Sequence, residues 1–106
     1  MIYVIDIDGT ICNDTEGKYE ECSPFISRIK EVNHLYDQGN TIIYQTARGM
    51  DSCNGDQVKA YKKYYHFTFN QLIDWNCQFH ELYLGKPKAD FYIDDKLITI
   101  TDFFNS

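Results

Sequence analysis

Short apolar runs alternate with segments of helical character along this chain of 106 residues. The apolar runs cover residues 2–7, 41–46, 82–84 and 91–93, and the segments expected to be helical cover 24–38, 56–65, 68–77 and 97–104. Strands that alternate with helices favour parallel pairing, with helices on both faces of one sheet. The order therefore predicts an α/β fold, a three-layer sandwich around a mostly parallel, Rossmann-like sheet, built as a single domain over residues 1–106.

Local signals set the expected ends of the helices. Ser23 followed by Pro24 predicts a helix start, with an N-cap before a proline at the first helical position, and Gly39 predicts the end of that helix. Thr68 and Gln71 fit a capping box, which predicts a second helix after the one that begins near Asp56. The preceding stretch 9–22 is polar and is expected to form a loop or a small flap.

The charge and the cysteines exclude some classes of protein. A net charge of −6 argues against a generic binder of nucleic acids or membrane surfaces. The four cysteines have no Cys-x-x-Cys pair, so reduced structural thiols are expected rather than a disulfide framework or a zinc site. The apolar run at the start stops at Asp6, and no stretch approaches the ~20 apolar residues of a membrane helix. We expect a cytoplasmic protein with no membrane partner.

Residues able to do chemistry stand where three of the four expected strands end. Asp6 and Asp8 follow the first strand, Thr46 ends the second, and Asp94 and Asp95 follow the last. The carboxyl ends of parallel strands meet at one edge of the sheet, where ligands bind in such folds. Several unpaired acids brought together there would need a cation, and all-oxygen ligands in a small site favour Mg²⁺.

A magnesium site beside a free aspartate is suited to phosphoryl chemistry, because the aspartate can attack phosphorus as a nucleophile. Lys86 and Thr46 are placed to neutralise and orient the remaining phosphoryl oxygens. Each feature alone is ordinary: Asp-x-Asp is usually a turn, a strand-terminal threonine a β-former, and Gly-Lys-Pro a turn. Their joint occurrence at strand ends, in this order, is what indicates a phosphoryl-transfer site.

In four motifs the sequence resembles the haloacid dehalogenase (HAD) superfamily of phosphohydrolases. The matching segments are VIDIDGT at 4–10, IIYQT at 42–46, Lys86 in Gly-Lys-Pro, and YIDD at 92–95, with Lys88 a possible substitute for Lys86. The wider pattern, TARGM at 46–50 with GKP and IDDK, is similar to small bacterial HAD phosphatases of capsule and polysaccharide biosynthesis.

The resemblance implies catalytic roles for both acids of the first motif. Asp6 would attack phosphorus to form an aspartyl-phosphate, and Asp8 would protonate the leaving oxygen and then activate water. Mg²⁺ would be held by Asp6, by the backbone carbonyl of Asp8 and by Asp95, with Asp94 binding through water or orienting Lys86. Because dehalogenases of the superfamily lack the second acid and the metal, Asp8 favours phosphate chemistry.

The resemblance also implies a set of residues that bind the phosphoryl group. Thr46 would donate to a phosphoryl oxygen, helped by backbone N–H groups near Ile7, and Lys86 would offset the charge on Asp6 and on the phosphoryl group. Thr10 of the first motif belongs to the same substrate-binding set. Arg48 would either clamp a second anionic group of the substrate or lie solvated in its loop.

Many members of the superfamily carry an inserted cap domain that selects the substrate. Here the gap between residues 10 and 23 has room only for a small flap, so we expect no cap domain and an open site, unless a second subunit of a homo-oligomer covers it. The sequence thus favours a Mg²⁺-dependent phosphatase for a sugar phosphate or another small phosphomonoester. The alternatives are a nucleotide or polynucleotide 3′-phosphatase, a non-enzymatic phospho-accepting regulator, and an inactive binding protein.

Overall fold

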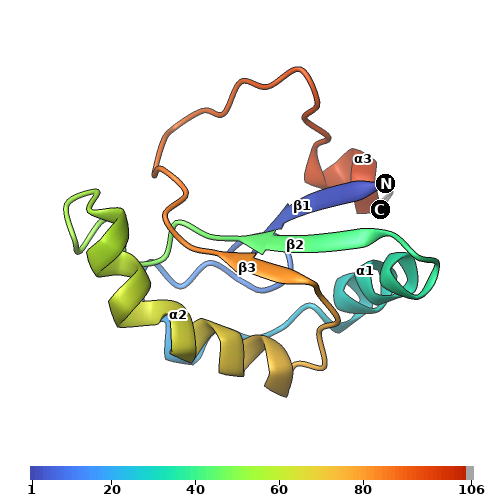
Figure 1. Ribbon diagram of the computed structural model, residues 1–106, viewed down its shortest axis with the longest axis horizontal. Helices are drawn as coiled ribbons and strands as arrows, with labels where there is room; N and C mark the ends of the chain where they lie inside the picture. Colours follow the sequence, from blue (N-terminus) through green and yellow to red (C-terminus); the bar gives the residue numbers. More distant parts are fainter. Residues whose placement is uncertain (105–106) are drawn as a thin grey trace.

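The protein is described by a computed structural model over residues 1–104, which form a parallel sheet with helices (Figure 1). The strands are β1 (Ile2–Asp6), β2 (Thr41–Gln45) and β3 (Glu81–Tyr83), hydrogen-bonded in the order β1-β2-β3. The helices are α1 (Ile26–Asp37), α2 (Gln57–Asp74) and α3 (Ile100–Phe104), with a short 3-10 turn, η1, at Tyr19–Glu21. The predicted α/β fold with a parallel sheet is confirmed.

One face of the sheet is buried and the other is open. Ile5, Ile42, Tyr44 and Leu82 point to the buried face and share a core with apolar side chains of α1 and α2. The alternate residues point away from this core, and on β1 Ile2 and Val4 remain 70% and 56% exposed. The third layer expected from the sequence is therefore not formed by residues 1–104, because no helix covers the second face.

Two predicted helix boundaries are wrong. Residues 23–25 run alongside 11–13, with the Phe25 N–H donating to the Ile11 carbonyl at 2.7 Å, so α1 begins only at Ile26. The two helices expected over 56–77 are one continuous helix, α2, whose N-cap is Asp56. The Asp56 carboxylate accepts from the N–H groups of Val58 and Lys59. Thr68, taken for a cap, lies buried in the middle of α2.

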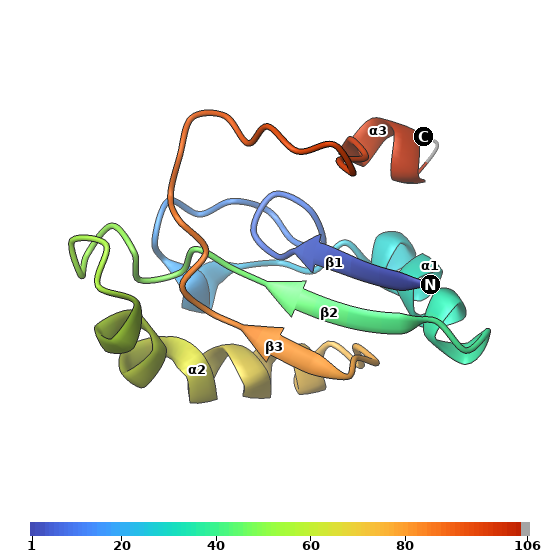
Figure 2. The ribbon, with the colours of Figure 1, turned by 45° about the horizontal axis from the view of Figure 1, so that its top comes forward.

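The largest difference from expectation is the arm, which we define as residues 85–99. The strand predicted at 91–93 is absent, and Phe91 and Ile93 are 84% and 98% exposed. Both views show the arm arching away from the sheet before α3 returns beside β1 (Figure 2). The final helix covers only 100–104 instead of 97–104. A strand needs a neighbour to satisfy its backbone groups, and the arm has none.

The arm is anchored at both ends. At its start, the Gln57 side-chain amide donates to the Gly85 carbonyl at 2.8 Å. Beyond its end, the Phe103 ring of α3 packs 5.7 Å from the ring of Tyr3 on β1. Only the middle of the arm is therefore without support from the rest of the described chain.

All four cysteines are free thiols. Among residues 1–104, no helix combines the length and apolar character needed to cross a membrane.

Candidate functional site at the carboxyl edge of the sheet

The turn that follows β1 presents two acids at the carboxyl edge of the sheet. Asp6 is the last residue of β1, and the chain then turns back so that the Thr10 and Ile11 N–H groups both donate to the Ile7 carbonyl at 3.0 Å. Gly9 sits in this turn at φ +82°, a left-handed conformation that disfavours other residues. The Ile7 side chain is fully buried, which anchors the turn between the two acids.

Backbone bonds continue the strand pairing past the ends of β2 and β3. The Thr46 N–H donates to the Tyr83 carbonyl at 2.9 Å, and the Lys86 N–H donates to the Thr46 carbonyl at 3.2 Å. Lys86 Nζ thereby reaches Asp6 Oδ1 at 3.6 Å, and the Thr46 hydroxyl lies 3.5 Å from Asp8 Oδ2. The structure thus brings four of the sequence-predicted residues together, from the ends of three strands.

Arg48 is buried against Asp8 and is not a solvated loop residue, so that alternative is wrong. The side chain is 1% exposed, and Nε and Nη2 donate to the two carboxylate oxygens of Asp8, each at 3.0 Å. Nη1 donates to the Thr68 hydroxyl at 3.3 Å, and the guanidinium lies 4.8 Å from the centre of the Tyr19 ring. To bind a substrate anion as expected, Arg48 would have to give up Asp8.

Sequence reasoning missed both Thr68 and Tyr19 as parts of this site. Tyr19 joins the site to its surroundings: its hydroxyl accepts from the Gly49 N–H at 3.0 Å, and its carbonyl accepts from the Gln71 side chain at 2.9 Å. No local pattern marks either residue, because each acquires its role only through contact with Arg48. The expected flap is therefore tied to the loop after β2 and to α2.

The two acids have different electrostatic surroundings. Burial raises the pKa of Asp6, and the nearby charge of Lys86 and the Ile7 N–H oppose that rise without cancelling it. Burial lowers the pKa of Arg48, but the hydrogen bonds and the charge of Asp8 outweigh this, so that it stands above its ordinary value. Arg48 is consequently a fixed cation paired with Asp8, while Asp6 holds its proton more tightly than an ordinary aspartate.

Two thiols lie beside Asp8, and their ligand atoms and a carboxylate oxygen of Asp8 lie within 4.8 Å of one another. Cys12 and Cys22 donate to Asp8 Oδ1 at 3.6 and 3.5 Å. Burial and the charge of Asp8 raise the pKa of Cys12, and burial raises that of Cys22. A soft metal would need thiolates, which these raised pKa values oppose, and Mg²⁺ prefers oxygen. The cluster is best described as thiols donating to a carboxylate.

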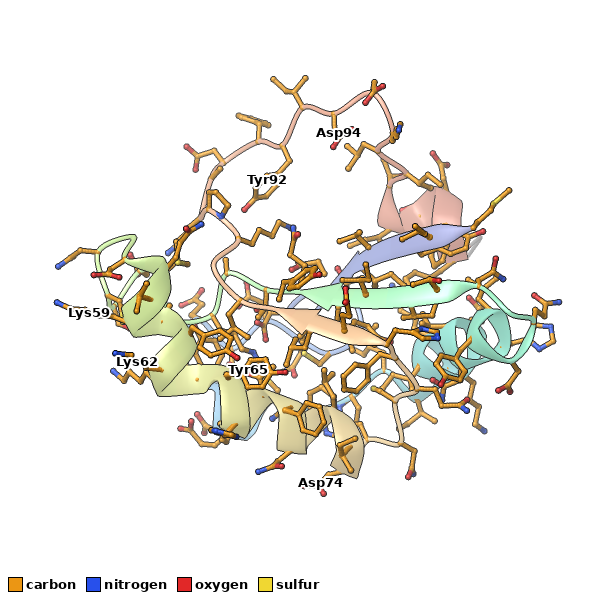
Figure 3. The ribbon with its side chains drawn as sticks, in the orientation of Figure 1. Lys59, Lys62, Tyr65, Asp74, Tyr92 and Asp94 are labelled. Atoms are coloured by element: carbon orange, nitrogen blue, oxygen red, sulfur yellow. The ribbon has the colours of Figure 1, made fainter. Side chains whose placement is uncertain are left out.

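Three other predicted residues lie elsewhere or are already engaged. Asp94 and Asp95 are exposed on the arm, where the Asp94 carboxylate accepts from the Lys96 N–H at 2.9 Å. Figure 3 shows Asp94 on the arch, away from the strand ends that carry the other acids. The expectation that one chain gathers them beside Asp6 is therefore wrong. Lys88, the possible substitute for Lys86, pairs instead with Asp51 at 3.2 Å.

The expected substrate-binding residue Thr10 is part of the turn itself. It is 8% exposed, and its carbonyl accepts from Arg28 Nη1 at 3.0 Å. An open depression of about 710 Å³ is lined by polar side chains such as Asp51, Asn54 and Lys88 and by the apolar Met50, Val58 and Pro87. Asp6, Asp8, Thr46 and Lys86 are not among its lining residues.

The residues of one chain do not complete a magnesium site. Both carboxylate oxygens of Asp8 are taken by Arg48, which leaves Asp6, itself beside Lys86, as the one available carboxylate among the predicted ligands at this edge. Two cationic side chains already balance the two acids there. A divalent ion would therefore need further oxygen ligands from outside this edge.

Comparisons with known proteins show the fold. The crystal structure of an MCSG target from Vibrio cholerae is similar to this chain with a TM-score of 0.90 and 24% sequence identity, covering 99% of this chain and 88% of the other. No family model matches the chain, and no curated protein is similar to it in sequence.

Proposed function

We propose that this protein is a phosphomonoester hydrolase of the HAD type that works through an aspartyl-phosphate. The observation that carries the proposal is the convergence of Asp6 with Lys86 at 3.6 Å and of Asp8 with Thr46 at 3.5 Å at one sheet edge. Asp6 and Asp8, Thr46 and Lys86 follow one another along the chain in the order of the first three motifs of the resemblance, at or just after the ends of β1, β2 and β3, which supports the proposal.

In this proposal Asp6 is the nucleophile. One of its carboxylate oxygens forms a bond to phosphorus while the bond from phosphorus to the leaving oxygen breaks, and that oxygen takes a proton from Asp8. Asp8 then removes a proton from water, whose oxygen attacks phosphorus and breaks the bond to Asp6, releasing inorganic phosphate. Thr46 and Lys86 bind the phosphoryl oxygens from two sides.

Asp8 can take the role of acid only after Arg48 releases it. Both carboxylate oxygens of Asp8 accept hydrogen bonds from Arg48, so in this arrangement neither is free to contact a leaving oxygen. A phosphoryl group bound at Asp6 brings anionic oxygens that compete with Asp8 for Arg48. We propose that this competition frees Asp8 when substrate is present. The freed Asp8 takes up a proton from solvent, which it then donates to the leaving oxygen, and Arg48 thereby contributes to substrate binding.

Mg²⁺ belongs to the proposal through the resemblance, and when bound it would neutralise charge on the phosphoryl group. Asp6 is the side chain of this edge that could hold it, and the remaining ligands are not supplied there by one chain. The three-layer arrangement is likewise proposed only for the protein with its open sheet face covered. A cytoplasmic location is part of the same proposal and agrees with four free thiols.

The proposed substrates are small phosphomonoesters, sugar phosphates first. Pro87 and Lys88, which follow Lys86 in the chain, line an open depression with both polar and apolar side chains, and its polar groups suit a hydroxylated leaving group. A nucleotide or polynucleotide 3′-phosphatase is the alternative, and a net charge of −6 disfavours the polynucleotide form. A phospho-accepting regulator would share the acids, Thr46 and Lys86, but has no need of Asp8 as an acid.

The test is phosphate release from sugar phosphates, nucleotides, 3′-phosphorylated oligonucleotides and p-nitrophenyl phosphate, each with Mg²⁺ and with EDTA. Asp6→Asn is the informative variant, and Asp37→Asn, exposed at the end of α1 and at the opposite edge of the sheet, is the control. Turnover that requires Mg²⁺, survives in the control and vanishes in Asp6→Asn is the expected result. A protein that becomes phosphorylated without releasing phosphate is a regulator, and one that does neither is not a phosphohydrolase.

A further inference from the structure

β1 forms an unpaired edge of the sheet. Among residues 1–104 it pairs with β2 alone, so the backbone groups along its other side have no strand partner. Beside this edge, the open face of the sheet carries the exposed side chains of Ile2 and Val4. α3 lies beside the start of β1, where Phe103 packs on Tyr3, but it adds no strand to this edge. An apolar edge strand is a template for pairing with another chain unless it is covered.

The middle of the arm is apolar and has no cover. Phe91 is 84% exposed, Ile93 98%, Leu97 60% and Ile98 57%. The arm is not a loose tail, because contacts at Gly85 and at α3 hold both of its ends. Its exposed side chains are thus presented on an arch of the kind that marks an interaction surface.

The arm cannot supply the missing strand to its own sheet in the orientation the site needs. Acids at 94–95 reach the carboxyl edge only if 91–93 runs parallel to β1. β3 ends at that same edge on the far side of the sheet, and only the seven residues 84–90 separate Tyr83 from Phe91. A parallel crossover needs about a dozen residues or more. The short connection therefore rules out this pairing within one chain.

We propose that the arm docks on a second copy of this chain, where residues 91–93 add a strand to the free edge of β1. In this arrangement Asp94 and Asp95 of one copy lie at the carboxyl end of β1 of the other, beside Asp6 of the partner subunit. The two copies are related by a twofold axis, so the arm of each copy pairs with β1 of the other. Each magnesium site is then built from two chains, a consequence that rests on the proposed function.

The apolar area is of the size that a dimer needs. Six side chains per copy, the four on the arm with Ile2 and Val4, expose on the order of 100 Å² each, or roughly 600 Å² together, against about 800 Å² per partner in a standard interface. Backbone pairing along β1 adds to this area. The crystal structure described above is similar over nearly the whole chain, so the arm lies within the shared fold.

The charge balance of the site supports the same arrangement. Within one chain, Lys86 and Arg48 already balance Asp6 and Asp8. The two further acids brought from a second copy come with a single cation, Lys96, whose charge acts on Asp94. They therefore create the excess negative charge that a divalent cation offsets, and metal binding becomes a property of the dimer.

The first test is the oligomeric state of wild type and of Ile93→Asp, by light scattering coupled to size-exclusion chromatography over a range of concentrations. Ile93 is 98% exposed, so its replacement leaves the packing of a single chain unchanged. We expect a dimer that Ile93→Asp weakens at least tenfold in Kd, whereas Ile73→Asp, at an exposed apolar position on α2, leaves it intact. A wild-type monomer at all concentrations, or a dimer unaffected by Ile93→Asp, overturns the proposal.

The second test asks whether the site is shared between chains. The Asp6→Asn variant and the double variant Asp94→Asn/Asp95→Asn are each inactive alone, and on mixing they exchange into heterodimers with one complete site. About a quarter of wild-type activity is expected, because half of the dimers are mixed and each has one good site. Binding of Mn²⁺, followed by electron paramagnetic resonance, should recover in parallel.

The two proposals fail in different ways. Wild-type turnover without recovery on mixing overturns the shared site and leaves the phosphatase in place. Absence of turnover, with a dimer that Ile93→Asp disrupts and with Mn²⁺ binding that recovers on mixing, overturns the phosphatase and supports the shared site. A metal bound equally well by the monomeric Ile93→Asp variant overturns the shared site, whatever the activity.

Discussion

Arg48 and Asp8 face each other through two parallel hydrogen bonds, Nε to Oδ2 and Nη2 to Oδ1, each 3.0 Å long. The pair connects the turn after β1 to the loop after β2, two segments that are 40 residues apart in the sequence. The Arg48 side chain is fully buried, whereas that of Asp8 is 19% exposed. Loss of the acid would thus leave an unpaired charge away from water.

Asp8→Asn is expected to destabilise the fold by about 3 kcal/mol, because it leaves the Arg48 charge buried without a counter-ion. The double variant Asp8→Asn/Arg48→Met should recover part of this loss, since the stranded charge is then gone. Urea unfolding of the wild type, both single variants and the double variant gives the coupling energy directly. Strictly additive losses would show that the pair contributes no mutual stabilisation.

Lys86→Met is expected to raise the pKa of Asp6 further, because burial already raises it above 3.8 and Lys86 works against that rise. Carboxyl carbon shifts of Asp6, followed by NMR during an acid titration in EDTA, measure the change. The control is Lys88→Met, which removes a lysine paired with the exposed Asp51 and should leave Asp6 unchanged. An Asp6 pKa that falls in Lys86→Met would contradict the geometry.

The raised pKa of Asp6 predicts how this residue's contribution to stability changes with pH. The folded state binds the Asp6 proton more tightly than the unfolded state does. Asp6 therefore stabilises the fold below pH 3.8, and this stabilisation is lost as the pH rises through the raised pKa of Asp6. The free energies of unfolding of wild type and Asp6→Asn are to be measured from below pH 3.8 to above the raised pKa of Asp6. As the pH rises through this range, the wild type should lose stability relative to Asp6→Asn.

Gly49→Ala is expected to cost about 2 kcal/mol more than Gly55→Ala. Both glycines have φ near +80°, so both variants carry the same backbone strain. A Cβ at Gly49 would stand 2.6 Å from Cδ2 of Tyr64, whereas at Gly55 it would meet nothing within 4 Å. Thermal unfolding of the two variants separates the close contact from the strain, and equal losses would show that Tyr64 moves aside freely.

Thiol labelling should begin at Cys53. Cys12 and Cys77 are buried, and burial raises the pKa of Cys77 to about 12, which leaves little thiolate at neutral pH. Cys22 and Cys53 are both partly exposed, but burial raises the pKa of Cys22, which leaves Cys53 as the first site of labelling. Mass spectrometry after brief iodoacetamide treatment should show one label on native protein, lost in Cys53→Ser, and further labels only after denaturation. Rapid native labelling of Cys77 would contradict the described core.

The parts of the fold that rest on local patterns could be predicted from the sequence. The apolar runs ending at Asp6, at Thr46 and near Leu84 are strands or strand ends, and the Asp56 N-cap starts a helix. The proximity of Lys86 to Asp6 followed from the rule that parallel strands end at one edge. These outcomes need only the nearest residues and the general geometry of parallel sheets.

The parts that failed depend on partners distant in the sequence. The Phe91–Ile93 run has the composition of a strand, but composition does not show that the connection before it is too short to reach β1. Thr68 has the sequence context of a cap, yet its hydroxyl accepts from Arg48, 20 residues away. Arg48 itself follows a strand in a polar loop, and only Asp8 explains its burial.

The contacts that hold Tyr19 bear on how the proposed phosphatase would select its substrate. The hydroxyl and the carbonyl of Tyr19 are both hydrogen-bonded to other segments, and its ring lies over the Arg48 guanidinium. These contacts hold the η1 stretch in place. In the proposed phosphatase, an η1 stretch held in this way would select substrates by their shape, without a closing step.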